Sequence, residues 1–290
     1  MSEEISSLEQ LVSEAERNCL TLSELVLSMQ AESMKTTEKK ILERMKENLQ
    51  VMRRSAENGM KEEHSASGLT GGMAGKLASH SPGLLGETAH RAAVYALAIA
   101  EHNACMGRIV AAPTAGSCGI LPGVLLALGE TKNISDECLV MGLLNAGAVG
   151  MVIARNANLS GAQGGCAAEC GSAGAMAASA VTELMGGSPI MCADACAIAL
   201  KAVMGLVCDP VAGLVEVPCV KRNASGAVIA LNSAELALAG IRSAIGADEV
   251  IGAMQSVGCM MNEALRETAL GGIAATKTAK EIEAKLRSKI

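Results

Sequence analysis

The stretch Glu87-Thr-Ala-His-Arg-Ala-Ala-Val-Tyr-Ala-Leu-Ala-Ile-Ala-Glu101 consists largely of alanine and aliphatic residues, and it decides the fold. Alanine has the highest helix propensity and loses no side-chain entropy on burial. Similar stretches follow almost to the end of the chain, separated by short segments rich in polar residues, glycine or proline. None of them alternates apolar and polar residues as a half-buried strand would. The sequence therefore predicts an all-α fold, a compact helical domain rich in alanine and glycine.

The composition indicates an unusual core. Apolar residues make up 50% of the 290 residues, but there is no Phe or Trp and a single Tyr, so aliphatic side chains and alanine must fill the interior. The mean hydropathy of +0.33 raises the question of a membrane protein. A membrane span needs about 20 mostly apolar residues, and the best candidate, Leu139–Ala154, is shorter and contains Asn145 and several glycines. We therefore expect no membrane span.

The N-terminal part differs from the rest, being rich in Glu, Lys and Arg with apolar residues at helical spacing. We predict an amphipathic helical arm over residues 1–60 and a main domain over residues 61–290. Thr21 and Glu24 form a capping-box pattern that starts a second helix, and a third helix is expected from about Thr37. Three apolar stripes are expected to be buried: Leu8, Leu11, Val12 and Ala15; Leu22, Leu25, Val26 and Met29; Ile41, Leu42, Met45, Leu49 and Met52.

The charge and the cysteine content limit which binding partners and which cellular compartment we expect for this protein. The net charge of −6 and the near absence of aromatic residues argue against nucleic-acid binding, which needs basic or stacking surfaces. The segment Met1–Gln10 is acidic and has no apolar signal sequence, so we expect a cytoplasmic protein. An odd number of cysteines, eleven, is not typical of a disulfide framework there. These cysteines are expected to be core residues, metal ligands or both.

Three cysteines stand where the backbone is expected to be irregular. Cys166 follows two glycines, Cys208 precedes Asp209-Pro210, and Cys219 follows Pro218. Glycine and proline end helices and leave backbone amides free to donate to sulfur. A thiolate set favours zinc or iron-sulfur ligation, and three cysteines without a fourth suggest an iron with an open position. Spacing alone leaves the alternative that these cysteines only fill space in the core.

The other cysteines that we considered lie in different settings. Cys118 directly follows Ser117 in a turn sequence and could not be placed. The rest lie within helical stretches rich in alanine and methionine, where a thiol is usually a small buried hydrophobe. The predicted core cysteines are Cys105, Cys138, Cys192, Cys196 and Cys259.

Several long motifs carry a family resemblance. Glu101–Gly107, Ala111–Pro122, Gly161–Glu169 and Cys208–Pro210 with Val217–Asn223 resemble the α chain of the iron-sulfur L-serine dehydratases. Ser67–Gly72 and Gly271–Thr276 also match, so the resemblance covers the chain from about residue 60 almost to its end.

The resemblance implies a 4Fe-4S cluster held by Cys166, Cys208 and Cys219, with the main domain as the cluster-binding catalytic domain. The remaining iron would take the hydroxyl of the substrate L-serine as a Lewis acid. A base would remove the α-proton, water would leave, and the aminoacrylate formed would hydrolyse to pyruvate and ammonia.

The resemblance also implies a substrate-binding loop around Pro113–Gly119 and a second one at Ser67–Gly72. Hydroxyl groups and backbone amides near glycine could bind the substrate carboxylate. An alternative for the first loop is a helix start capped by Ser117. The residues expected to bind substrate are Thr114, Gly116, Ser117, Ser67, Thr70 and Gly71.

The sequence offers no general base. His64, His80, His90 and His102 lie in no motif for proton transfer. The resemblance implies a separate β subunit that supplies a histidine from a Ser-Ser-His-Thr type motif, which this sequence lacks. The family also includes a single-chain relative whose C-terminal cysteine caps the open iron, and this sequence ends without one. Site candidates of lower rank are Glu101, Asn103 and Lys76.

Other functions stay open at this point. A cysteine desulfidase or a threonine dehydratase could use the same fold, because one methyl group gives only roughly 1–3 kcal/mol of discrimination. A non-catalytic iron-sulfur sensor could also carry three cysteine ligands. A pyridoxal-phosphate dehydratase is a weaker alternative, because no lysine lies in a recognisable segment for that cofactor.

Overall fold

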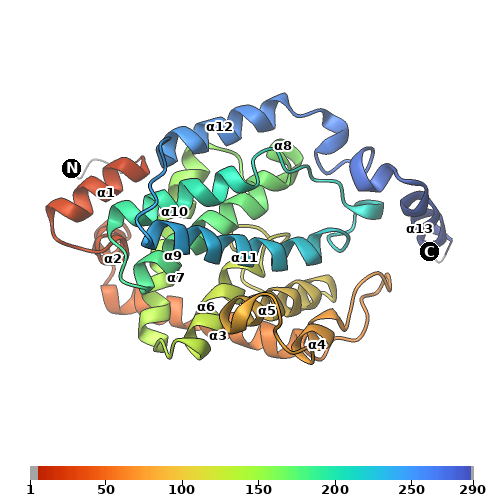
Figure 1. The fold of residues 1–290 in the computed structure, drawn as a ribbon, viewed down its shortest axis with the longest axis horizontal. Helices are drawn as coiled ribbons and strands as arrows, with labels where there is room; N and C mark the ends of the chain where they lie inside the picture. The colour runs from red at the N-terminus through yellow and green to blue at the C-terminus, as the bar shows by residue number, and fades with distance from the viewer. Residues whose placement is uncertain (1–5, 289–290) are drawn as a thin grey trace.

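The computed structural model describes residues 6–288 as helices joined by short loops (Figure 1). That range contains no strand and a single isolated bridge, between Cys208 and Arg266. The predicted all-α fold is confirmed. Residues 1–5 of the acidic segment and residues 289–290 lie outside the described range. The α-helices are α1 Leu8–Arg17, α2 Leu22–Ser33, α3 Glu38–Gly59, α4 Met73–Ala78, α5 Gly86–Ala104, α6 Ile120–Thr131, α7 Asp136–Asn156, α8 Gly161–Cys166, α9 Ser172–Leu184, α10 Pro189–Ala202, α11 Cys219–Leu238, α12 Ala247–Met260 and α13 Lys277–Arg287.

Helix α9 forms the centre of the molecule. Every residue from Ser172 to Thr182 is buried, and α9 packs against α6, α7, α10 and α11. Figure 1 shows α9, α10 and α11 across the middle, with α12 above them and α5 and α3 below in this view. Five of the eleven residues from Ser172 to Thr182 are alanine. Small side chains let helix axes approach closely, as the composition predicted.

The N-terminal helices pack against the body of the molecule. Helix α1 lies against α10 and α12, and α2 and α3 lie against α7. The Asp248 carboxylate accepts hydrogen bonds from the amides of Leu8 at 2.8 Å and Glu9 at 2.9 Å, which ties α1 to the start of α12. The capping box of Thr21 and Glu24 is confirmed. The division of the chain at residue 60 stays a prediction.

Most residues of the predicted apolar stripes are buried. The whole first stripe is buried, and α3 begins after Thr37, which caps it as expected. Met29, Leu42 and Met45 are only partly buried and pack at the edge of the core. Helical periodicity therefore predicted the inner faces of these helices correctly.

Helix α7 is the one described helix that is long and apolar enough to cross a membrane by composition. The test applies to Asp136–Asn156, and 61% of its apolar window is buried inside the protein. The helix begins at Ser135, whose side chain accepts from the Cys138 amide. Contacts with α2, α3 and α9 cover it. Its apolar character is that of a core helix.

Two of the predicted core cysteines are not in the core. Cys192 and Cys196 are buried as expected, but Cys138 and Cys259 are exposed and Cys105 is only partly buried. Cys138 lies in the first turn of α7 and Cys259 in the last turn of α12, on the outward faces of these helices. In a helix so rich in small apolar residues, composition does not show which side faces solvent.

Helix α6 packs so closely on α5 that there is no room for a methyl group at Gly123. A Cβ atom on Gly123 would lie 2.8 Å from the Ala96 nitrogen and 2.9 Å from the Ala92 oxygen. Gly123→Ala is expected to lower the free energy of unfolding by about 1–3 kcal/mol through overpacking. Gly147→Ala is the control, because nothing lies within 4 Å of the added atom and alanine favours a helix over glycine by roughly 0.5–1 kcal/mol.

Urea unfolding followed by circular dichroism gives the free energy of unfolding of the wild type and of both variants. A stability of Gly123→Ala equal to or above that of the wild type would show that α5 and α6 are not in backbone contact.

Candidate functional site

Cys166 lies at a break in the chain just before the central helix. Gly165 has a φ of 70°, which favours glycine, and interrupts α8 directly before Cys166. The next residues, Ala167–Gly171, form the π-helical turn η1, which leads into α9. The Ala167 amide donates to the Leu206 oxygen at 2.9 Å. π-helical turns are rare and are frequent at functional sites.

Cys208 and Cys219 lie on the segment between α10 and α11. The Cys208 amide donates to Leu265 at 2.9 Å and its carbonyl accepts from Glu267 at 2.7 Å, so the loop after α12 holds this residue. Cys219 is the first residue of α11 and follows a cis peptide bond between Val217 and Pro218. Both cysteines are therefore fixed by backbone geometry.

The three thiols are close enough to affect one another. Burial, with the negative charge of Cys166, raises the pKa of Cys219 to about 12. The same two causes raise the pKa of Cys208. None of the three cysteines is in a disulfide. The predicted ligand set thus consists of three free thiols in one region, contributed by two separate segments.

Cys170, which the sequence interpretation did not consider, lies beside Cys166. Their sulfur atoms are 3.3 Å apart in a hydrogen bond, and Cys170 is buried. This hydrogen bond, together with the positive charge of Arg222, lowers the pKa of Cys166. Two cysteines four residues apart lie on one face of a helix, so their spacing could have indicated the contact.

An ion pair between Arg222 and Asp209 fastens the segment that carries Cys208. Arg222 Nη2 lies 2.9 Å from Asp209 Oδ1, and Arg222 Nη1 donates to the Val207 oxygen at 2.8 Å. Asp209 also accepts from the Ile273 amide at 2.7 Å. Helix α11, the cysteine segment and the loop after α12 therefore meet at one buried carboxylate.

The loop that contains Thr114, Gly116 and Ser117 is tied to the helix of Cys219. Asn223, on α11, donates to the Gly116 oxygen and accepts from the Gly119 amide, both at 2.8 Å. The hydroxyl groups of Thr114 and Ser117 lie 3.1 Å apart, and Ser117 is fully buried. The alternative that Ser117 caps a helix is wrong, because α6 begins after Gly119 without a side-chain cap. Ser117 instead supports Thr114.

The second predicted loop is held by a buried carboxylate. Glu216 accepts from the hydroxyl groups of Ser65 at 2.6 Å and Ser67 at 2.9 Å, and it lies three residues before Cys219. Thr70 is only 5% exposed, and its hydroxyl has no hydrogen-bond partner. A buried polar atom without a partner is costly and needs an explanation. A ligand that binds this hydroxyl would supply one.

Gly71, the last predicted residue of this loop, requires glycine. It has a φ of 136°, and a Cβ atom there would collide with the backbone of Glu63 and His64. The next residue, Gly72, has a φ of 70° and begins α4. The loop is therefore pressed against the segment that precedes it.

The candidates of lower rank have other roles. Glu101 is fully buried and accepts from the amides of Met73 and Ala74 at 2.9 and 3.0 Å, which holds the start of α4. Asn103 donates to the Ala115 oxygen at 3.3 Å and thereby supports the first substrate loop. Lys76 is exposed. Among these three, only Asn103 contacts a predicted site segment.

The four histidines form no hydrogen bond or ion pair with Cys166, Cys208 or Cys219 in residues 6–288. His102 is buried and its Nδ1 lies 2.9 Å from Glu62 Oε1. His64 and His80 are exposed, and His90 lies in the first turns of α5. A base outside this chain stays a prediction.

Glu169 is a carboxylate of the site to which the sequence interpretation gave no role. It lies in the π-helical turn, three residues after Cys166. Burial and the charge of Glu267 raise its pKa, and the Thr114 hydroxyl lowers it. A Cβ atom on Gly116, in the first predicted substrate loop, or on Gly161, beside Cys208 Sγ, would touch this carboxylate, which places Glu169 between that loop and Cys208.

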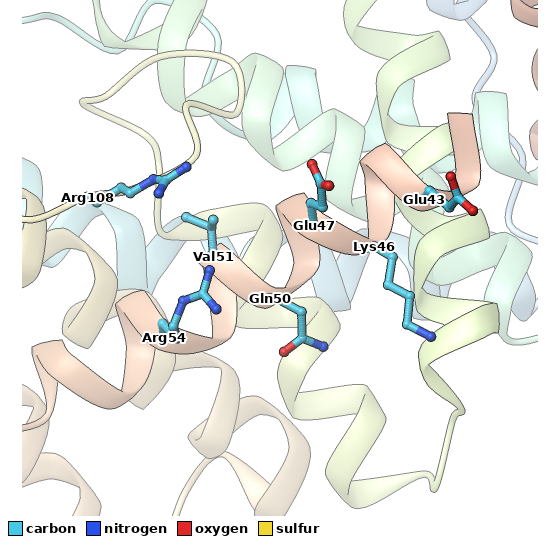
Figure 2. A pocket seen from close by; sticks show the side chains of 7 residues that line it. All are labelled: Glu43, Lys46, Glu47, Gln50, Val51, Arg54 and Arg108. Atoms are coloured by element: carbon cyan, nitrogen blue, oxygen red, sulfur yellow. The ribbon is translucent and has the colours of Figure 1, made fainter. Parts of the chain in front are cut away.

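A large surface pocket of about 560 Å³ lies elsewhere, along α3. Figure 2 shows its charged and polar lining, with Arg108 reaching in from the loop after α5. None of the predicted site residues lines it. The lining residues are Glu43, Lys46, Glu47, Gln50, Val51, Arg54 and Arg108.

Comparison with known proteins identifies the family of this chain. The family described as serine dehydratase alpha chain matches residues 17–274. The chain belongs to this family. A relative from Bacillus subtilis strain 168, named "Probable L-serine dehydratase, alpha chain", is 47% identical over 283 residues, which cover 97% of this chain and 94% of the relative. The L-serine dehydratase alpha chain of Peptoniphilus asaccharolyticus is 43% identical and covers 91% of each chain.

A longer relative of this serine dehydratase alpha chain matches only in part. An L-serine dehydratase of Escherichia coli K12 is 44% identical over 183 residues, which are 62% of this chain and 40% of that protein. The family resemblance stated from the motifs is confirmed.

The ion pair between Arg222 and Asp209 is more buried than the one between Arg53 and Asp136, so we expect its loss to lower the free energy of unfolding more. Arg222 and Asp209 side chains are 16% and 3% exposed, so Arg222→Met leaves a buried carboxylate without its cation, which costs about 3–5 kcal/mol. Arg53→Met is the control, because Arg53 and Asp136 are 35% and 33% exposed and such pairs contribute about 1 kcal/mol or less. Urea unfolding under reducing conditions measures both. An equal loss of free energy of unfolding in the two variants would contradict the claim that burial makes the Arg222–Asp209 pair more important for stability.

The hydrogen bonds of Glu216 lead to a prediction about how rarely the second predicted substrate loop, residues 65–72, opens. Glu216→Ala removes the acceptor of Ser65 and Ser67, so hydrogen exchange of the amides in residues 65–72 is expected to accelerate. Glu216→Gln keeps a carbonyl acceptor and should retain most of the protection. Exchange that is unchanged in the alanine variant would show that other contacts order the loop.

Proposed function

We propose that this chain is the α subunit of a cytoplasmic enzyme that dehydrates L-serine to pyruvate and ammonia with a 4Fe-4S cluster. Cys166, Cys208 and Cys219 would hold the cluster. The observation that carries the proposal is the grouping of these three free thiols beside the two predicted substrate loops. The names of the Bacillus subtilis and Peptoniphilus asaccharolyticus relatives support L-serine as the substrate.

The chemistry of the donor set fits a cluster better than a single ion. Among residues 6–288, no three His, Cys, Asp or Glu side chains lie close enough to share one metal ion. In a cluster each cysteine binds a different iron, so the thiols lie farther apart than around zinc. Thiolates are the usual ligands of iron-sulfur clusters. Three protein ligands leave one iron free for a substrate.

The cluster, when bound, would supply a Lewis acid that makes the substrate hydroxyl a better leaving group. The chain itself would bind and orient the amino acid. Thr114 and the backbone near Gly116 would bind the substrate carboxylate, while Ser117 and Asn223 hold that loop in place. The unpartnered hydroxyl of Thr70 supports a further contact from the second loop.

The α-proton would pass to a residue outside this chain. Within residues 6–288 no histidine forms a hydrogen bond with the three cysteines, and His102 Nδ1 lies 2.9 Å from Glu62 Oε1. We propose that a separate β subunit supplies the histidine base, as the family resemblance implies. The alpha chain designation of the relatives supports such a partner.

Cysteine substitutions test the ligand set. Cys166→Ala, Cys208→Ala and Cys219→Ala are each expected to lose the cluster and serine dehydration, because each removes one iron ligand. Cys192→Ala is the control, since Cys192 is buried like Cys166 and Cys208 but lies in the middle of α10. Iron and sulfide analysis of anaerobically prepared protein, with pyruvate release in the presence of the β subunit, gives the two readouts. Equal iron content in all four variants would overturn the ligand assignment.

A further inference from the structure

The Glu169 carboxylate lies between the first substrate loop and the start of α8. A Cβ atom placed on Gly116 would lie 3.3 Å from Oε2 and 3.4 Å from Oε1 of Glu169. A Cβ atom placed on Gly161 would lie 2.9 Å from Oε2. The Glu169 carboxylate therefore packs directly against both glycines and occupies the space that a side chain at either position would need.

Gly161 also lies against one of the proposed cluster ligands. Its Cβ position is 2.9 Å from Cys208 Sγ as well as from Glu169 Oε2. Gly116, whose Cβ position borders the Glu169 carboxylate, belongs to the same loop as Thr114. A small molecule that contacts both the Thr114 loop and the cysteines would therefore meet Glu169 between them.

Glu169 has no cationic partner among the described residues, where no Lys, Arg or His forms an ion pair with it. Arg222, the cation that acts on Cys166, is paired with Asp209. The neighbouring charge at Gly161 is another carboxylate, that of Glu267. Glu169 is half-buried beside this second carboxylate and has no cation, so a ligand that carries a positive charge would be attracted to it.

We propose that Glu169 binds the α-ammonium group of L-serine and selects amino acids over hydroxy acids of the same shape. This inference rests on the proposed function. In this arrangement the Thr114 loop holds the substrate carboxylate, the hydroxyl faces the cysteines, and Glu169 holds the third substituent of the α-carbon. Three contacts of different charge fix one enantiomer in one orientation.

The other carboxylates near the site either have partners already or are exposed. Glu216 accepts from two serine hydroxyl groups, and Glu101 accepts from two backbone amides. Glu267 is exposed on the loop after α12. Glu169 is therefore the carboxylate best placed for this role.

The experiment compares L-serine with 3-hydroxypropanoate, which keeps the carboxylate and hydroxyl but lacks the ammonium group. It uses the anaerobic holoenzyme with its β subunit. In Glu169→Gln, the KM for L-serine is expected to rise about tenfold or more, the loss typical of a hydrogen bond between charged groups. The inhibition constant of 3-hydroxypropanoate should stay unchanged or fall. The iron content should stay at the wild-type value.

Two further variants complete the test. Glu169→Asp keeps the charge and should retain more of the preference for L-serine than Glu169→Gln, even if both variants lose stability. Glu263→Gln is the control, because Glu263 is an exposed glutamate of the loop after α12, and it should leave both constants at the wild-type values.

Three results would overturn the inference: parallel weakening of L-serine and 3-hydroxypropanoate, a fall in kcat with an unchanged KM, or equal discrimination in the Gln and Asp variants. A wild-type holoenzyme that releases no pyruvate from L-serine would contradict the proposed function itself. An active wild type with unaltered discrimination in Glu169→Gln would contradict only the role of Glu169.

Discussion

Close contact between helix backbones is the constraint on which the rest of this structure depends. Alanine and glycine bring the helices together, and α9 is buried along nearly its whole length. Cys166 stands at the π-helical turn that leads into α9, and Cys219 is the first residue of α11, which packs on α9. The positions of two thiols are thus set by the buried central helix and by a helix packed on it. Cys208 is held by backbone hydrogen bonds to the loop after α12.

Buried carboxylates organise the loops around these thiols. Asp209 joins the cysteine segment to α11 and to the last loop, Glu216 holds the second substrate loop, and Glu101 holds the start of α4. A buried charge is tolerated only where hydrogen bonds or opposite charges satisfy it. The buried Thr70 hydroxyl differs, because it has no hydrogen-bond partner. The half-buried Glu169 forms no ion pair with a described Lys, Arg or His, and in the proposed complex the α-ammonium group of L-serine would supply its partner.

Local signals in the sequence predicted much of the fold. The capping box at Thr21 and the apolar stripes depend on residues close in the chain, so periodicity identified them. The exposed Cys138 and Cys259 show where this fails, because an alanine-rich helix has no distinct apolar face. The ligand cysteines came from the family motifs and the irregular backbone around them. The roles of Glu216 and Glu169 depend on contacts with residues far away in sequence, which no local pattern reveals.

The central claim is that three thiols hold a cluster with one iron open to the substrate. Mössbauer spectroscopy of the anaerobic holoenzyme, reconstituted with iron-57, tests this claim most directly. Addition of L-serine is expected to change the spectrum of a single iron site while the other sites keep their parameters. A spectrum without a cluster in enzyme that is fully active, or a cluster whose iron sites all ignore the substrate, would contradict the account.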